Sequence, residues 1–359
     1  MILSAVLLVV CALAAASATD PVDVFTPGLG GVAQFRIPAL VRTSKATLIA
    51  FAEARMHPET DCGYKWIVAR RSETNGSTWG PLIDVVGREW GQWATGNVQP
   101  FFHEPSGRIV AVVGSKDLSK PGRLCEPGTA VFALDDNGSD GLYWGPARNI
   151  SGALASARGG ATLLPGPGTG LVLSRTRPGR LLAVGLAGGA YSSEAVFWSD
   201  DVGLSWSVAG VEVGPGVDEA NLVELGDGTV YLSMRSTQAR QAYALSSNGG
   251  ETWGPVTHDP ALITPQCEAS VAAYSGALYF ANPASEAVRA NITIRRTAPG
   301  AGPTQWQAAT HLVAPGITWG GYTSMPKEPI SDTLSGILFE RNTTTTTFVI
   351  SFATFPLDF

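Results

Sequence analysis

The stretch SETNGSTW, residues Ser72–Trp79, has two relatives in this chain of 359 residues: SDDVGLSW at Ser199–Trp206 and SSNGGETW at Ser246–Trp253. All three follow the pattern Ser-x-Asp-x-Gly-x-Thr-Trp, although Thr74 and Asn248 replace its Asp. Ser and Asp or Asn side chains hydrogen-bond to nearby backbone groups, and Gly accepts positive φ, so the pattern predicts a tight turn. The closing Trp would bury a large ring under that turn. We expect these turns to stabilise the scaffold and to take no part in catalysis.

The spacing of the three turns indicates a repeated β-unit. Ser199 and Ser246 are 47 residues apart, and a β-propeller blade takes roughly 40–50 residues. Ser72 and Ser199 are 127 residues apart, so at least one repeat between them has lost its signature. The segment Leu134–Trp144 resembles a stretched copy. Repeated turns between strands therefore favour a propeller over a sandwich or a barrel.

Short apolar runs bounded by Gly, Pro, Asn or Asp predict strands along the whole chain. They are Ala39–Val41, Leu48–Phe51, Ile67–Ala69, Ile109–Val113, Leu171–Leu173, Val196–Trp198, Leu222–Leu225, Val230–Met234, Ser270–Ala273, Leu278–Phe280, Ile292–Ile294 and Gly336–Phe339.

The composition agrees with an all-β protein and excludes some classes of function. Gly occurs 42 times and Pro 24 times, and charged residues make up only 15% of the chain, as expected for many short strands joined by turns. The net charge of −6 argues against a nucleic-acid partner. It permits a small anionic ligand if positive charge is concentrated in one pocket. With four His and no clustered Cys/His spacing, we expect no metal site and no cofactor.

The amino-terminal residues resemble a secretory signal. Ile2–Ala16 is almost purely apolar, and Ala16-Ser17-Ala18 offers a small-x-small cleavage site. An uncleaved anchor is the alternative, but the run is short for a membrane span of about 20 residues. We therefore predict a signal peptide over residues 1–18, a single domain over residues 19–359, no stable membrane insertion, and a secreted or secretory-pathway location, including a lysosome or vacuole.

Two further features concern that compartment. If Cys11 lies in the signal, Cys62 and Cys125 are the pair that we expect to form a disulfide in an oxidising compartment, because both lie in polar, turn-rich loops. Cys267 then remains unpaired. Five Asn-x-Ser/Thr sequons are candidate glycosylation sites, at Asn75, Asn137, Asn149, Asn291 and Asn342.

Arg36 lies in the segment FRIPAL, Phe35–Leu40. A lone Arg at the entry of an apolar strand is usually part of a structural ion pair. Followed by the repeated turns, however, Phe-Arg-Ile-Pro resembles the motif of the sialidase (exo-α-neuraminidase) family, and the similarity runs along nearly the whole chain. The resemblance implies a six-bladed β-propeller of four-stranded antiparallel sheets. It also implies a retaining hydrolase that releases terminal α-linked sialic acids from glycoconjugates.

The resemblance implies a cluster of three arginines that holds the substrate carboxylate. Arg36 and Arg235 match two members, and Arg289 matches the third, with Arg296 as a competing choice. Guanidinium groups form bidentate, charge-assisted bonds to a carboxylate and stay ionised when desolvated. Glu340 matches a carboxylate that orients the first arginine. Its alternative is an exposed charge at the end of a strand.

The resemblance also implies the reacting groups. Tyr322, in GGYTSM, matches the nucleophile, although Thr323 replaces the usual Ser. Glu219 matches the carboxylate that activates this tyrosine, with Glu224 as the alternative. Asp61 matches the acid/base group. Without the family context, a Tyr is more often a packing residue and a loop Asp more often part of a turn.

Further positions match the surroundings of the family's pocket. Glu53 and Arg55 correspond to contacts with the C4 region of the sugar, and Asn97 either lies near the pocket or caps a turn. The loop Gly166–Gly170 resembles one near the channel mouth. It is no phosphate loop, because it lacks Lys and no helix follows.

Three alternatives share this scaffold. The same residues would serve a trans-sialidase or a hydrolase that prefers the deaminated sugar Kdn. A propeller lectin would bind sialosides without turnover, and intact Asp61, Glu219 and Tyr322 argue against it.

Overall fold

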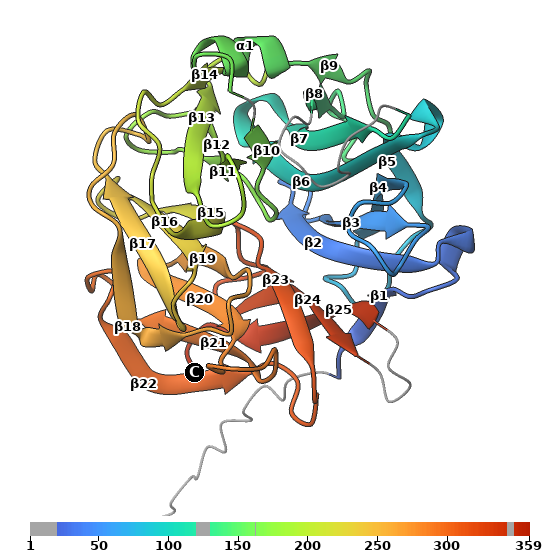
Figure 1. Cartoon of the computed structure of the whole chain (residues 1–359). Helices are drawn as coiled ribbons and strands as arrows, with labels where there is room; N and C mark the ends of the chain where they lie inside the picture. Colours follow the sequence, from blue (N-terminus) through green and yellow to red (C-terminus); the bar gives the residue numbers. More distant parts are fainter. Residues whose placement is uncertain (1–19, 120–129, 162, 343–347) are drawn as a thin grey trace, which may run out of the picture.

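The computed structural model describes residues 20–119, 130–161, 163–342 and 348–359, and its strands are arranged around a central axis (Figure 1). Each of the twelve predicted strands lies in or overlaps an observed one. The predicted signal peptide lies outside the described residues. No helix in the described ranges is long and apolar enough to cross a bilayer.

Hydrogen bonding groups the strands of the described residues into five sheets. Three of them have four or five strands and use the middle of the chain: β10 (Leu163–Pro165) with β11 (Leu171–Val172), β12 (Leu181–Ala187), β13 (Ser193–Ser199) and β14 (Ser207–Val208); β15 (Val217–Glu224), β16 (Val230–Ser236), β17 (Arg240–Ser246) and β18 (Thr257–Ile263); and β19 (Ser270–Tyr274), β20 (Ala277–Pro283), β21 (Ile292–Thr297) and β22 (Trp306–Leu312).

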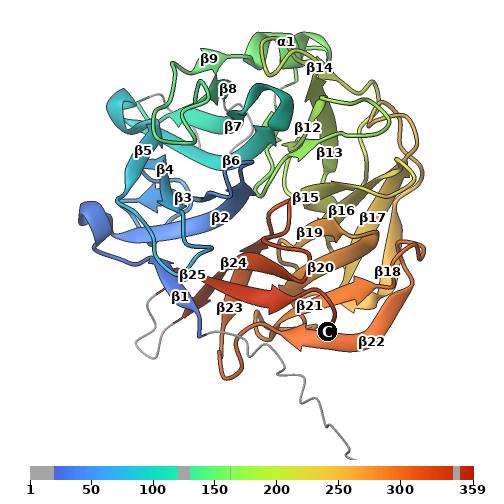
Figure 2. The same ribbon diagram turned by 180° about the vertical axis from the view of Figure 1, so that it is seen from behind.

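The other two sheets use the two ends of the described chain. One has the order β1-β25-β24-β23, in which an early strand pairs with the last of three late strands: β1 (Val22–Phe25), β25 (Phe348–Pro356), β24 (Leu334–Asn342) and β23 (Gly320–Ser324). The other has eight strands: β2 (Gln34–Arg42), β3 (Leu48–Arg55), β4 (Lys65–Ser72), β5 (Ile83–Val86), β6 (Trp93–His103), β7 (Arg108–Asp117), β8 (Ala130–Asp135) and β9 (Arg148–Asn149). Seen from behind, the pairing of β1 with β25 closes the ring (Figure 2).

The predicted all-β propeller of antiparallel sheets is confirmed, but six separate four-stranded sheets are not. The eight-stranded sheet consists of an antiparallel half β2–β5 and an antiparallel half β6–β9. Among the described residues, one parallel pair, Lys65 with Ala94, joins the two halves. In addition, β11 gives another sheet a fifth strand.

The three repeated turns have the predicted geometry. Each connects two consecutive, antiparallel strands: β4 to β5, β13 to β14, and β17 to β18. In the first of them, the Ser72 hydroxyl accepts the Gly76 N–H at 2.9 Å, and the Trp79 indole N–H donates to the Gly76 carbonyl at 3.0 Å. Gly76 has a φ of +87°, where a side chain is disfavoured. The turns at Ser199 and Ser246 repeat these contacts.

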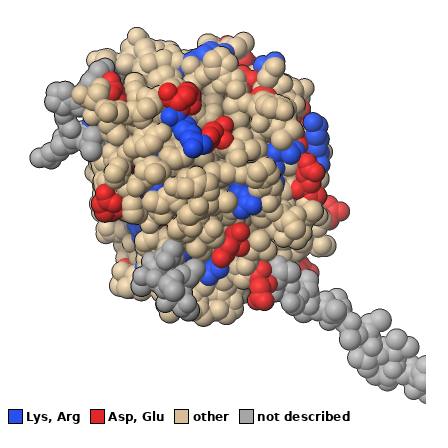
Figure 3. Space-filling model, turned by 90° about the vertical axis from the view of Figure 1, so that its right-hand side faces the viewer, with Lys and Arg blue, Asp and Glu red and all other residues tan. Residues whose placement is uncertain are grey.

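The core lies between neighbouring sheets, so a strand can be buried on both faces. All eight residues of β3 are buried, Glu53 and Arg55 among them. On the face shown in Figure 3, acidic and basic side chains are interspersed among mostly uncharged residues. One helix of six residues, α1 (Ser151–Ser156), lies at the periphery (Figure 1).

Candidate active site

A cavity of about 400 Å³ lies where the inner strands of several sheets meet. Larger hollows of 620 and 690 Å³ occur elsewhere on the described surface, but their linings lack this concentration of opposite charges. The lining brings together eight of the predicted site residues: Arg36, Arg55, Asp61, Asn97, Glu219, Arg235, Arg289 and Tyr322. The rest of the lining consists of Ile37, Lys65, Ala94, Gly96, Gly114, Lys116 and Leu164.

Irregular strand pairing places several of these residues. The register shifts between Arg36 and Ala39 in β2, between Gly96 and Gln99 in β6, and between Asp218 and Ala220 in β15. It also shifts between Gly320 and Thr323 in β23, around Tyr322. A β-bulge interrupts the ladder and re-aims a side chain. Each of these inner strands therefore presents a polar side chain to the cavity at its bulge.

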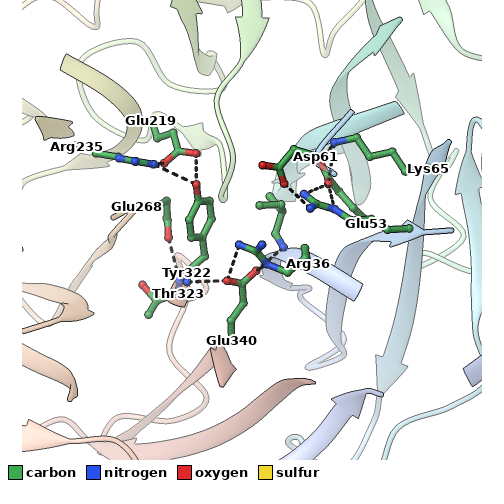
Figure 4. Close-up of polar contacts among 12 residues, drawn as sticks. Arg36, Glu53, Asp61, Lys65, Glu219, Arg235, Glu268, Tyr322, Thr323 and Glu340 are labelled. Atoms are coloured by element: carbon green, nitrogen blue, oxygen red, sulfur yellow. Dashed lines mark hydrogen bonds and ion pairs between the residues drawn. The ribbon is translucent and has the colours of Figure 1, made fainter. Parts of the chain in front are cut away.

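The hydroxyl of Tyr322 is paired with a carboxylate and an arginine (Figure 4). It donates a short hydrogen bond to Glu219 Oε1, and Arg235 Nη1 donates to the same hydroxyl at 3.3 Å. Arg235 Nη1 also lies 2.6 Å from Glu219 Oε2. Burial and the nearby Glu219 charge raise the pKa of Tyr322 well above its usual value. The phenol is therefore neutral, with a carboxylate positioned to accept its proton.

Arg36 is held by Glu340, which belongs to β24. The guanidinium Nε lies 2.6 Å from Glu340 Oε1, and Nη2 donates to Oε2 at 3.1 Å. Burial would lower the pKa of Arg36, but the Glu340 carboxylate outweighs it and the pKa is raised. Glu340 also accepts the backbone N–H groups of Ile37 and Tyr322. It thus fixes Arg36 and the Tyr322 backbone at once.

Arg289 lies in the loop between β20 and β21 and lines the cavity. Its guanidinium lies 5.4 Å from the centre of the Tyr322 ring, and that of Arg36 lies 5.6 Å from it. Within the described ranges, no acidic side chain forms an ion pair with Arg289. Arg296 instead donates to the Phe359 carbonyl and stacks on the Phe359 ring. Arg289 therefore lies at the cavity and its competitor does not.

Asp61 lies on the loop between β3 and β4, and its side chain is 73% exposed. One of its oxygens accepts a hydrogen bond from Arg55 Nη1. Partial burial raises the pKa of Asp61, but Arg55 and Arg36 outweigh burial and hold the pKa below its usual range. In this structure Asp61 is an ionised carboxylate at the cavity edge.

Glu53 lies beneath the cavity and does not line it. Its carboxylate is fully buried, accepts bonds from Arg55 at 2.6 and 2.8 Å and from Lys65 at 2.9 and 3.0 Å, and accepts the Asn97 N–H at 2.9 Å. Glu53 therefore reaches a ligand only through Arg55 and Lys65, and not through the direct contact that the resemblance implies.

The pKa values of Glu53 and Lys65 are both lowered, but for different reasons. Burial raises the pKa of Glu53, but Lys65 and Arg55 outweigh it and lower the pKa to about 2. Burial is the largest influence on Lys65 and lowers its pKa, although Glu53 opposes this. Four side-chain donor contacts and one backbone N–H converge on Glu53 and stabilise its ionised state.

Acid titration should expose the contribution of Glu53 to stability. A carboxyl group whose pKa is lowered by folding contributes its full stabilisation at pH values above its ordinary pKa of 4.5. This stabilisation is lost as the pH falls toward the lowered pKa of about 2. The difference in unfolding free energy between wild type and Glu53→Gln should therefore shrink by about 3 kcal/mol from neutral pH to pH 2. Denaturant titrations at a series of pH values measure this, and a constant difference would contradict the ion pairing.

Other predicted positions have structural explanations. Asn97 lines the cavity with a φ of +52°, and its amide donates to the Pro165 carbonyl. Glu224, the alternative to Glu219, accepts the backbone N–H groups of residues 174–176 and does not line the cavity. In the loop Gly166–Gly170, the Thr169 hydroxyl bonds to Leu40 and Ser324 and joins two inner strands.

Sequence reasoning missed several residues of the site. Tyr191 accepts a bond from Arg235 Nε at 2.9 Å and stacks on the same guanidinium. Lys65 and Lys116 line the cavity, and Glu268 is buried behind Tyr322. A Lys at the entry of the buried strand β4 was a detectable signal for Lys65. No comparable pattern marks Glu268, because its partners are distant in sequence.

Cys62 and Cys267 lie among the described residues. Cys62 is disulfide-bonded, and Cys267 is a buried free thiol. The predicted partner, Cys125, lies outside the described residues.

No protein-family profile matches the chain. A sialidase of Micromonospora viridifaciens is 30% identical over 351 residues, which cover 89% of this chain and 52% of the relative. An exo-alpha-sialidase of Aspergillus fumigatus is 29% identical over 76% of this chain and 70% of its own length. The chain thus spans about half the length of the first relative.

Solved structures agree on the fold. A Hadza microbial sialidase superposes with a TM-score of 0.76 over 91% of this chain and 66% of its own, at 23% identity. An intramolecular trans-sialidase of Ruminococcus gnavus, in complex with oseltamivir carboxylate, gives a TM-score of 0.78 over 94% and 97%, at 16% identity. The chain's relatives in sequence are thus curated sialidases, and the solved structures show that it shares the sialidase β-propeller fold.

Proposed function

We propose that this protein is an exo-α-sialidase, a retaining glycoside hydrolase that acts on sialic-acid-terminated glycoconjugates. One observation carries the proposal: a buried phenol bonded to a carboxylate, with the guanidinium groups of three arginines around it. We further propose that the two halves of the eight-stranded sheet act as separate blades. With the other four sheets they make six, in a single domain.

The cations around Tyr322 favour an anionic substrate. Glu340 and Glu219 pair with Arg36 and Arg235, while Arg289 faces the cavity without an acidic partner among the described residues. A cluster of cations is costly to assemble unless an anion compensates it. A carboxylate held by bidentate guanidinium contacts meets this requirement.

A substrate carboxylate also explains a tyrosine nucleophile. Most retaining glycosidases use Asp or Glu, and sialidases are a recognised exception. Sialic acid carries its carboxylate on the anomeric carbon, so a carboxylate nucleophile would meet like-charge repulsion. A neutral phenol avoids this repulsion and gains nucleophilicity when Glu219 takes its proton.

The proposed reaction has two steps. Asp61, protonated in the complex, donates its proton to the glycosidic oxygen as the bond to the anomeric carbon breaks, and Tyr322 Oη forms a bond to that carbon while Glu219 accepts the phenolic proton. Asp61, now ionised, then removes a proton from a water molecule that attacks the anomeric carbon. The tyrosyl bond breaks and Glu219 returns the proton to Tyr322.

Substrate binding would raise the pKa of Asp61 and so favour its protonated form. The carboxylate of the substrate would offset the charge of Arg36, one of the two cations that lower the Asp61 pKa. The leaving sugar would also cover the exposed side chain. Both changes raise a carboxyl pKa.

We propose a secreted or secretory-pathway protein, lysosome or vacuole included, on the basis of the apolar segment Ile2–Ala16. The disulfide at Cys62 supports an oxidising compartment.

A direct test uses the purified protein with a fluorogenic α-sialoside. The proposal expects fluorophore release, with the α-anomer of free sialic acid as the first product by NMR. Binding without release would identify a lectin. Sialyl transfer to an added galactoside would identify a trans-sialidase, and a higher rate on the matched Kdn glycoside would identify a Kdn-preferring hydrolase.

Asp61→Asn should separate acid assistance from the rest of the reaction. The variant should lose about 10²- to 10⁴-fold in kcat/KM on a natural sialyl-galactoside, whose leaving group needs a proton. It should lose much less on an aryl sialoside, whose leaving group departs without one. Equal losses on both substrates would contradict the acid role.

A further inference from the structure

Two carboxyl groups hold the backbone of Tyr322 and the residue after it (Figure 4). Glu340 Oε2 accepts the Tyr322 N–H at 3.1 Å, and Glu268 Oε2 accepts the Thr323 N–H at 2.9 Å. These residues lie at the bulge of β23, where the regular ladder with β24 is interrupted. The two side chains therefore replace strand pairing at the position of the phenol.

Glu268 also contacts the strand that carries Glu219. Its Oε1 accepts a hydrogen bond from Asn221 Nδ2 at 2.8 Å, and Asn221 lies two residues after Glu219 in β15. Glu268 is 1% exposed and does not line the cavity. Two hydrogen bonds thus link Thr323 through Glu268 to Asn221, and they join the same two strands, β23 and β15, as the Tyr322–Glu219 hydrogen bond.

We propose that Glu268 is a positioning residue that sets the separation of the Tyr322 hydroxyl from the Glu219 carboxylate by linking β23 to β15. This inference rests on the proposed function. It adds a residue that contacts neither the substrate nor the reacting atoms and acts through the backbone of Tyr322 and through Asn221.

The surroundings of Glu268 indicate how a conservative replacement should behave. Complete burial raises its pKa well above the usual value, and the charges of Glu219 and Glu340 act in the same direction. A neutral carboxylic acid resembles the Gln amide in shape and charge. In Glu268→Gln the amide oxygen can still accept the Thr323 N–H, and the amide NH₂ can donate to Asn221 once that side chain turns its own oxygen toward it. Glu268→Gln should therefore retain the link, whereas Glu268→Ala leaves the Thr323 N–H and the Asn221 amide without their acceptor.

Asp259 offers a matched control. It is also 1% exposed, and it likewise accepts one backbone N–H, from Ala261, and one side-chain N–H, from Trp306. It lies in β18, the outer strand of its sheet, and not at the cavity. Asp259→Ala therefore removes the same kind of buried acceptor without touching the Tyr322–Glu219 link.

The experiment compares wild type, Glu268→Ala, Glu268→Gln and Asp259→Ala. It measures kcat on a fluorogenic α-sialoside, the dissociation constant of 2,3-dehydro-sialic acid, the rate of covalent labelling by a 3-fluorosialyl fluoride, and Tm. Glu268→Ala should lower kcat and the labelling rate about 10- to 100-fold, as expected for a small misplacement of reacting groups. Its dissociation constant should stay within about twofold, because the arginines are intact. Glu268→Gln should keep kcat close to the wild-type value. Asp259→Ala should lower Tm and leave kcat and the labelling rate unchanged.

Distinct results overturn the two proposals. A wild type that neither turns over the sialoside nor becomes labelled refutes the proposed function. A wild type that is labelled at the same rate as Glu268→Ala refutes the positioning role, as does failure of Glu268→Gln to restore kcat. If Glu268→Ala does not fold, Asn221→Ala cuts the same link from β15, and an unchanged kcat in that variant refutes the role.

Discussion

Tyr322→Phe should reduce kcat on an α-sialoside by about 10³-fold or more, because the variant loses the oxygen that forms the covalent bond. The hydroxyl also accepts from Arg235 and donates to Glu219, so both contacts are lost. Binding of a carboxylate-bearing inhibitor should change far less, since the phenyl ring and the arginines remain. Steady-state kinetics and inhibitor titration measure the two quantities. Intact-mass analysis after reaction with a 3-fluorosialyl fluoride should show the adduct in wild type alone.

Tyr231→Phe is the matched control for this experiment. The Tyr231 hydroxyl is buried and has no hydrogen-bond partner in the described structure, and its ring stacks on Tyr243 away from the cavity. Removing an unpaired buried hydroxyl should leave stability unchanged or raise it. We expect the control to have wild-type kcat and to form the 3-fluorosialyl adduct to the same extent as wild type. A Tyr322→Phe enzyme with wild-type kcat would exclude the tyrosyl intermediate.

Arg289→Gln should lower kcat/KM by about 10²- to 10³-fold. Loss of a bidentate, charge-assisted contact to a carboxylate corresponds to about 3 to 4 kcal/mol. The effect should appear mainly in binding of the substrate and of sialic acid, measured by kinetics and calorimetry. Because no acidic side chain in the described ranges pairs with Arg289, the substitution should cost little folding stability.

Arg296→Gln tests the same assignment from the competing position. Arg296 lies seven residues further along, donates to the Phe359 carbonyl at 2.9 Å and stacks on the Phe359 ring. The substitution should therefore lower Tm slightly and leave kcat/KM unchanged. The reverse pattern, with Arg296→Gln inactive and Arg289→Gln active, would show that the third member of the cluster is wrongly assigned.

Local interactions were the part of the fold that sequence could predict. The contacts of the first repeated turn lie within Ser72–Trp79, so the residue types determine the geometry directly. The grouping of strands depends on pairing between distant segments, and the single bridge from Lys65 to Ala94 has no sequence signal. Hence the propeller was predicted and the eight-stranded sheet was not.

The candidate site divides in the same way. Arg36 and Tyr322 stand in recognisable motifs, and the structure places both at one cavity. Glu53 was assigned to a sugar contact by the resemblance alone, and the burial of all of β3 between sheets, which the resemblance does not show, places its carboxylate beneath the cavity. Glu268 escaped notice because its contacts, Thr323 and Asn221, lie 55 and 47 residues away in sequence.

The ion pair between Arg36 and Glu340 has a consequence for folding. The two residues are 304 positions apart, so their contact closes nearly the whole chain into one loop. Local sheets can form early, but such a distant contact must await the slow search that brings remote segments together. Arg36 lies in the eight-stranded sheet and Tyr322 in the sheet of β1 and β23–β25. A partly folded chain that lacks one of these sheets therefore lacks one of the two residues at the cavity. An incompletely assembled molecule would therefore lack part of the proposed site, and recovery of the proposed activity during refolding would report closure of the ring.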